Sequence, residues 1–450
     1  MPNLRALRAR LAALGLAAAA AGAACSTSVS DPNIVSPNAL RDSTALPTVL
    51  NGAVGDLAHA YAGDNGNTEG VILLGGLRAD EWRNSDYFDT RIQVDRGVIN
   101  VNNGSVDSLF AILNIARRSA ELATSTFTRL APGDYRHAAA LNIDAYAYVL
   151  LAETFCSGIP FTDLQSNGTS FAYGSPLTTQ QVFAAAKARF DTAATIADAA
   201  AAGGSARAQQ EAYLARVGRA RALVGLGRYA EAAASVDSVP TTFEYDVLYS
   251  ENTGRENNGV YGFNVINARW SVADSEGTNG LPFISAKDPR VPVTDAGQTG
   301  VDATTELFTF DKYASLSSPI PLATGTEARL IEAEAALNAQ NPQQALGILN
   351  TLRATAGLAA LALGADMPAQ TLQLFSERAF WLFATAHRLG DMRRLVRPTG
   401  QGGYGFAITS VFPTGPYPKG GAPYGTEVNL PIPVDERNNP NFTQCIDRTT

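Results

Sequence analysis

The stretch TGTEARLIEAEAALNAQNPQQALGILNTLRATAG, residues 324–357, decides the fold of this chain. Apolar side chains recur in it at steps of three and four, which is the period of a helix with one buried face. Asn341 is a natural N-cap, Pro342 fits the first position of a helix, and Gly357 supplies a left-handed stop. The stretch therefore predicts two helices joined by a short turn.

A third helix is predicted after a connection that glycine and proline interrupt. It includes SERAFWLFATAHRLGDMRRL, residues 376–395, and we expect Gly390 to end it. Its apolar stripe consists of Leu372, Phe375, Ala379, Leu382 and Ala386. Acids of the first helix can pair with bases of this one, and we interpret these pairs as structural ties between helices. They are Glu327, Glu332 and Glu334 on one side and Arg378, Arg388, Arg393 and Arg394 on the other.

Alanines that face alanines let antiparallel helices pack closely, which is typical of tetratricopeptide hairpins. A second signature of this repeat lies in GLGRYAEAAASVDSVP, where Gly227, Tyr229, Glu231 and Ala232 match the turn and the start of the second helix. Further helical periods cover residues 39–62, 106–130, 135–155, 178–202 and 209–226. The sequence therefore predicts a mostly α-helical protein, with repeat hairpins at about 106–238 and 324–395.

Three segments lack this period. Residues 75–104 are turn-rich and dense in aromatic and charged side chains, and we expect a long ordered loop there. Residues 240–321 predict an irregular insertion with a few short strands, and residues 396–450 form a tail rich in Gly, Pro and Tyr. Loops of such length in a compact protein usually bind something, so these insertions are candidates for the ligand side.

Residues 1–24 combine a basic start with an apolar run, as in a secretory leader. Small residues directly precede Cys25, which predicts lipidation of this cysteine, although an ordinary leader with a chance cysteine is the alternative. Residues 25–38 would then be a lipid-anchored tether and 39–450 the folded part. Cys156 and Cys445 remain as an even pair in an exported protein, and we expect them to form a disulfide.

Composition excludes several classes of function. The chain has 450 residues and a net charge of −8, and it has no cluster of Lys and Arg, so nucleic acid is not an expected partner. It contains only three histidines, which disfavours a metal site. We find no zincin, nucleophile-elbow, Walker or dinucleotide motif, and no cofactor is implied. The adjacent acids Asp80 and Glu81 resemble a hydrolytic pair only superficially, so we do not expect an enzyme.

Aromatic residues of the two insertions are the candidate ligand-binding groups. Flat rings stack on sugar faces because both surfaces are apolar and rigid, although rings can equally anchor their own loop in the core. The candidates for stacking are Trp82, Tyr87, Phe88 and Trp270. The candidates for hydrogen bonds to a ligand are Arg83, Asn84, Asp86 and Arg91.

Several motifs, taken in their order, make the chain resemble the SusD/RagB family of outer-membrane nutrient-binding lipoproteins. They are the small residues before Cys25, AETFCSGIPF at 152–161, DPRV at 288–291, DKY at 311–313, residues 376–395, and LPIPVDERNNPN at 430–441. One departure is Thr385-Ala386-His387, where the family commonly has a Glu-Gly pair.

The resemblance implies a SusD-like fold and a binding function at the cell surface. Such a protein is anchored in the outer membrane by its lipid, binds a glycan, an oligosaccharide or a peptide, and delivers it to a TonB-dependent β-barrel transporter of the SusC type. The alternative is a helical-repeat scaffold of the envelope without a small ligand. The irregular aromatic insertions favour the binding function, because a pure scaffold would consist of further repeats.

Overall fold

The computed structural model describes residues 42–164 and 171–448. The leader, Cys25 and the tether lie outside these residues. Residues 42–45 belong to a short unit of their own, in which Ser43–Ala45 form the 3-10 helix η2. The second unit begins at Leu46 and contains the rest of the fold. Among the residues described, no helix is long and apolar enough to cross a membrane.

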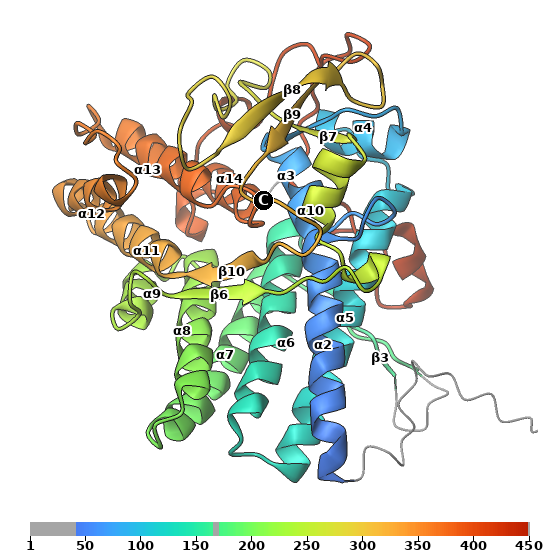
Figure 1. The fold of residues 1–450 in the computed structure, drawn as a ribbon, viewed down its shortest axis with the longest axis vertical. Coiled ribbons are helices and arrows are strands. Elements are labelled where there is room, and N and C mark those ends of the chain that lie inside the picture. The colour runs from blue at the N-terminus through green and yellow to red at the C-terminus, as the bar shows by residue number, and fades with distance from the viewer. Residues whose placement is uncertain (1–41, 165–170, 449–450) are drawn as a thin grey trace, which may run out of the picture. The chain divides into compact units, whose positions relative to one another are not determined.

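The first half of this unit is a series of long helices that pack side by side (Figure 1). They are α2 (Leu46–Ala62), α5 (Gly104–Leu130), α6 (Tyr135–Thr154), α7 (Thr179–Ala201), α8 (Ala206–Gly225) and α9 (Tyr229–Val236). Polar caps start four of them, because a side-chain oxygen accepts from the free amides of the first turn. These caps are Asn103, Asp134, Thr178 and Ser205. The sequence predicted these helices to within a few residues, except that α2 starts at Leu46 and not at residue 39.

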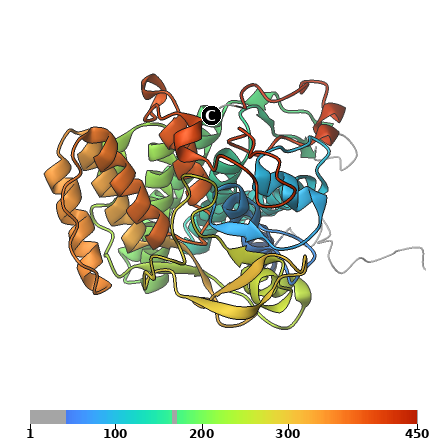
Figure 2. The same cartoon turned by 90° about the horizontal axis from the view of Figure 1, so that it is seen from above.

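The second group of helices contains the stretch that decided the fold. It consists of α11 (Gly325–Asn338), α12 (Pro342–Thr355), α13 (Met367–Trp381) and α14 (Arg388–Val396). The side chain of Asn341 caps α12 at the amide of Gln344, and Gly357 adopts a φ of 69° after the helix. Both end signals are therefore confirmed. Figure 2 shows these helices grouped on one side of the molecule.

The predicted third helix is in fact two. The helix α13 ends at Trp381, and left-handed residues at Ala384 and Ala386 break the period before α14 begins. Gly390 therefore lies inside α14 and does not end a helix. Leu372 belongs to the predicted apolar stripe, but its side chain is 43% exposed. The break has a packing cause, because it turns the ring of Phe383 onto the aromatic core of the insertion.

Buried ion pairs tie these helices together, and those of Glu334 are among the pairs that the sequence predicted. The carboxylate of Glu334 in α11 lies 2.9 Å from Arg394 of α14 and 3.8 Å from Arg378 of α13. Asp391, which the sequence analysis did not single out, accepts from Arg378 at 2.7 Å. Glu332 does not join this network, since it pairs with Arg329 of its own helix. Glu327 instead faces His387 at 3.1 Å, and Arg388 faces Asp80 at 3.4 Å, so the predicted ties are confirmed only in part.

The predicted loop at 75–104 contains helical turns and a strand, which corrects the expectation. It contains the end of α3 (Val71–Arg78), the strand β1 (Trp82–Asn84) and α4 (Asp89–Arg96). Every residue of α3 is buried, so the helix shows no polar stripe that a periodicity argument could detect. The helix α4 spans only two turns and ends at Gly97, which has a φ of 74°.

The insertion between α9 and α11 has the expected short strands. It contains β6 (Glu244–Val247), η3 (Gly254–Glu256), α10 (Gly259–Tyr261), η4 (Gly262–Ile266), β7 (Trp270–Val272), β8 (Val293–Thr299), β9 (Glu306–Phe310) and β10 (Ile320–Thr324). The antiparallel pairs are β1–β7, β6–β10 and β8–β9. The pair β1–β7 therefore joins the first insertion to the second.

The C-terminal tail packs back on the first hairpin. The expected disulfide between Cys156 and Cys445 is present, with Cα atoms 5.9 Å apart. A parallel bridge joins Phe155 to Leu430 beside it. The tail includes η5 (Thr399–Gln401), α15 (Ile408–Val411) and η6 (Val434–Asn438). Two small strand pairs follow the first hairpin. They are β2 (Ile159–Pro160) with β5 (Pro176–Leu177) and β3 (Asp163–Leu164) with β4 (Phe171–Ala172).

Candidate functional site

The two segments predicted to form the ligand surface do meet, but their tryptophans point inward. Trp270 of β7 lies opposite Asn84 of β1, and Trp82 lies opposite Val272. Both indoles are 0% exposed. They pack edge-on or tilted against buried phenylalanine rings of the insertion and of the turn after α13. Neither tryptophan offers a ring face to a ligand in this structure. The prediction that Trp82 and Trp270 stack on a ligand is therefore wrong.

Tyr87 and Phe88, by contrast, lie at the surface. They occupy the turn between β1 and α4, and they are 65% and 44% exposed. Their ring centroids are 5.2 Å apart at an interplanar angle of 34°. The buried side chain of Asp86 stabilises the turn, because its carboxylate accepts a hydrogen bond from the backbone amide of Phe88 at 2.7 Å. Two aromatic rings are thus held side by side and open to solvent, which is the geometry that stacking on a flat ligand requires.

Two guanidinium groups flank the ring of Phe88. Those of Arg91 and Arg269 lie 5.0 and 5.3 Å from its centroid. The carboxylate of Asp86 forms ion pairs with both arginines, and its distance to Arg269 is 3.2 Å. The carboxylate of Glu69 accepts a hydrogen bond from Arg91 at 2.5 Å. The cluster therefore contains two cations and two anions, and it presents hydrogen-bonding groups with no net charge beside the rings.

A cavity of about 420 Å³ opens next to this cluster. This volume lies in the usual range of small-molecule sites. The lining residues are Gly66, Asn67, Glu69, Phe88, Thr90, Arg91, Gly104, Ser105, Ser108 and Arg269. Amide, hydroxyl and guanidinium groups thus surround one exposed ring. This combination suits a polyhydroxylated ligand, since such a ligand needs both an apolar face and many hydrogen-bond partners.

The remaining predicted residues have structural positions. Arg83 is paired with Glu276, and the buried side chain of Asn84 binds the backbone of Asp86 at 3.1 Å. Asp86 itself is buried beneath the rings, so it acts through Arg91 and Arg269. From the predicted set, the structure therefore brings Phe88 and Arg91 to the cavity, and Tyr87 lies beside it through its contact with Phe88.

Sequence reasoning missed most polar groups of the cavity. They are Asn67, Glu69, Thr90, Ser105, Ser108 and Arg269. Arg269 directly precedes the predicted Trp270, and strand alternation could have indicated that its side chain points the opposite way. Single serine and threonine residues carry no such signal.

The adjacent acids Asp80 and Glu81 have partners in the interior of the protein. Asp80 and Glu81 are fully buried, and burial raises the pKa of Glu81 to about 8. Asp80 faces Arg388 at 3.4 Å, and Glu81 accepts the amide of Ala384 at 3.1 Å. Within the described residues, no group of three His, Cys, Asp or Glu side chains could hold a metal ion.

Comparison with solved structures finds many that share the fold. A SusD-like protein from Bacteroides fragilis is 13% identical, with a TM-score of 0.64 over 92% of this chain and 98% of that chain. The surface glycan-binding protein A of Bacteroides uniformis is 14% identical, with a TM-score of 0.63 over 89% of this chain and 99% of that one. A laminarin-binding SusD-like protein is also 14% identical, with a TM-score of 0.63 over 90% and 99% of the two chains.

Sequence comparison gives no further relationship. No protein-family model matches the chain, and no curated protein matches it. A likeness at 13% to 14% identity shows a shared fold.

Proposed function

We propose that this chain, which has the fold of SusD-like proteins, is a cell-surface binding lipoprotein that captures a glycan for import. The observation that carries the proposal is the exposed pair Tyr87 and Phe88 beside a polar cavity of about 420 Å³. Neighbours of the same fold are glycan-binding and laminarin-binding proteins, which supports a glycan as the ligand class over a peptide.

The complete proposal includes the anchor and the partner. Lipidation of Cys25 would hold the protein on the outer membrane, and a TonB-dependent β-barrel of the SusC type would receive the ligand. Support for both comes from the sequence motifs and the resemblance that they carry. Cys25→Ser should move the protein from the membrane fraction to the soluble fraction of the cell envelope. Unchanged partitioning into detergent would contradict the lipid anchor.

Binding is tested by calorimetry with laminarin and a panel of other soluble neutral and acidic glycans. We expect at least one of them to bind, and we expect Phe88→Ala and Tyr87→Ala each to weaken that binding about tenfold or more. The loss follows from the apolar contact that one ring provides, worth roughly 1–3 kcal/mol. Neither variant should change the melting temperature appreciably, since both rings are already exposed.

Tyr173→Ala is the matched control, because Tyr173 is exposed to the same degree as Phe88 and does not line the cavity. It should leave glycan binding unchanged. If no glycan of the panel binds, or if both variants at the site bind as the wild type does, the proposed site is wrong. The alternative of a repeat scaffold without a ligand predicts the first of these results.

A further inference from the structure

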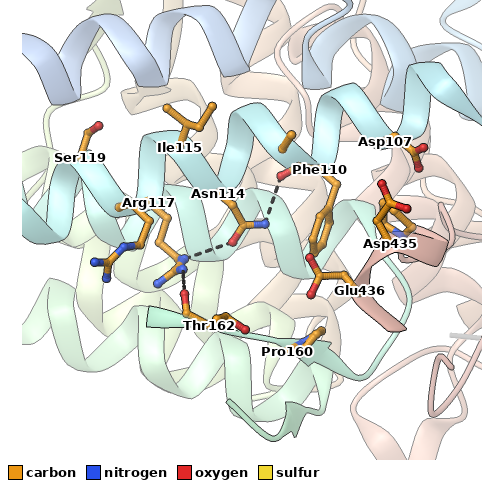
Figure 3. A pocket seen from close by; sticks show the side chains of 13 residues that line it. Asp107, Phe110, Asn114, Ile115, Arg117, Ser119, Pro160, Thr162, Asp435 and Glu436 are labelled. Carbon is orange, nitrogen blue, oxygen red and sulfur yellow. Dashed lines mark hydrogen bonds between the residues drawn. The ribbon is translucent and has the colours of Figure 1, made fainter. Parts of the chain in front are cut away.

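A second cavity of about 420 Å³ has no part in the proposed glycan site. It opens between α5, residues 160–162 and η6 (Figure 3). The lining residues are Asp107, Phe110, Ala111, Asn114, Ile115, Arg117, Arg118, Ser119, Pro160, Thr162, Pro433, Asp435 and Glu436. The cavity thus joins a repeat helix to the C-terminal tail, more than 300 positions later in the chain.

Three carboxylates gather at one end of this cavity. Asp107 comes from the first turn of α5, and Asp435 and Glu436 come from η6 (Figure 3). Within the described parts of the chain, none of the three side chains has a hydrogen-bond or ion-pair partner. Burial raises the pKa of Asp107 and of Glu436, the neighbouring Asp435 raises both further, and Arg117 partly lowers that of Glu436. The protein therefore holds like charges close together, and Arg117 offsets the repulsion only in part.

Among the described residues, neither arginine of the same cavity forms a direct ion pair with these carboxylates. Arg117 lies at the other end, where it binds Glu121 at 2.7 Å and the carbonyl of Thr162 at 3.3 Å. Arg118 pairs with Asp163 at 2.8 Å. Both guanidinium groups are thus engaged by other partners. The acidic end stays available for an external cation.

The tail is fixed where it brings its two acids to α5. The amide of Val434 donates to the carbonyl of Val101 at 3.2 Å, and the amide of Cys156 donates to Leu430 at 2.9 Å. The disulfide to Cys445 closes this arrangement covalently. These ties hold the carboxylates in place against their mutual repulsion, so the acidic end is formed before any partner arrives.

Apolar side chains form the walls between the two ends. Phe110, Pro160 and Pro433 are largely buried, whereas Ile115 is 51% exposed at the rim. Arginine and lysine side chains need such a site, with an apolar surface for the stem and carboxylates for the charged head.

We propose that this cavity docks a segment of a partner protein that inserts an arginine or lysine side chain between the three carboxylates. Charge complementarity argues for this occupant over an uncharged one, because only a cation relieves the repulsion that the fold maintains. The proposal does not depend on the glycan function, since the two cavities share no lining residue.

A displayed library of random peptides tests the proposal with the disulfide-bonded full-length protein. We expect the selected peptides to share one arginine or lysine flanked by apolar residues. Replacing that residue by citrulline, which keeps the shape of arginine without its charge, should weaken the binding of a selected peptide about tenfold or more. Selection of peptides without a shared basic residue, or equal binding of the citrulline peptide, overturns the proposal.

Variants of the tail separate docking from a structural role. Asp435→Asn and Glu436→Gln should each weaken binding of the selected peptide about tenfold. Each should also leave the melting temperature unchanged or higher, because a repulsive charge is removed. Glu251→Gln is the control, an exposed carboxylate outside the cavity lining, and it should not affect binding. If the tail variants melt lower and still bind the peptide, the acids are structural and the proposal is wrong.

Discussion

Arg91 connects the exposed aromatic pair to the core, and its replacement should be costly. The side chain is buried and binds Glu69 and Asp86, both of which are almost fully buried as well. Its guanidinium also lies 4.9 Å from the ring centroid of Trp270 and 5.0 Å from that of Phe88. The residue therefore compensates two buried charges and contacts three rings, since it also lies 5.1 Å from the ring centroid of Phe263.

Arg91→Met keeps most of the stem and removes the charge. Asp86 retains Arg269 at 3.2 Å, but Glu69 then keeps only the hydroxyl of Ser105 at 3.4 Å. A buried carboxylate without its partner destabilises a protein by about 3–5 kcal/mol. We expect a loss of this size in the free energy of unfolding, measured by urea denaturation.

A second substitution tests the stated cause. Glu69→Gln in the Arg91→Met background removes the orphaned charge, so the double variant should regain a large part of the lost stability. Arg118→Met is the matched control, because this arginine is 40% exposed in its pairs with Glu121 and Asp163. It should change stability by no more than about 1 kcal/mol. A loss below about 1 kcal/mol for Arg91→Met, or a double variant no more stable than the single one, would refute the reasoning.

Three further predictions concern the interior. Trp82→Ala should lower the free energy of unfolding by about 3–5 kcal/mol, because it empties a fully buried ring site; a melting temperature equal to that of the wild type would contradict the burial. Cys156→Ser with Cys445→Ser opens a loop of 289 positions and should cost up to about 5 kcal/mol in chemical denaturation, compared with the oxidised protein. Glu81 has a folded pKa of about 8 against an ordinary 4.5, so the folded state binds more protons than the unfolded state and stability falls as pH rises through this window. Glu81→Gln should flatten that fall in melts recorded across the window, and an unchanged slope would show that Glu81 is not the cause.

Local signals in the sequence determined the helical repeats. The caps and stops around α12 act within four residues, and the apolar steps of three and four depend only on the turn of a helix. For this reason Asn341, Pro342 and Gly357 were interpreted correctly from the chain alone. The helix α3 was missed because all its residues are buried and its pattern has no polar side.

The break after α13 was also beyond local reasoning. The stripe of apolar residues continues through it, and Gly390 offered a plausible end of the helix. The chain instead turns at Ala384 and Ala386, where Phe383 reaches a cluster that contains Trp82 and Phe310. The packing partner of Phe383 is distant in sequence, so only the tertiary structure could place the end of the helix.

What the sequence determined by itself was the helical core, the pairing of Cys156 with Cys445, and the two segments that meet at the proposed glycan site. It could not decide which aromatic rings of those segments face a ligand. Trp82 and Phe88 are only six positions apart, and both are large apolar side chains. The antiparallel pairing of β1 with β7 turns Trp82 into the core, while the turn before α4 leaves Phe88 at the surface. That choice depends on strand register, which is set by contacts with residues nearly two hundred positions away.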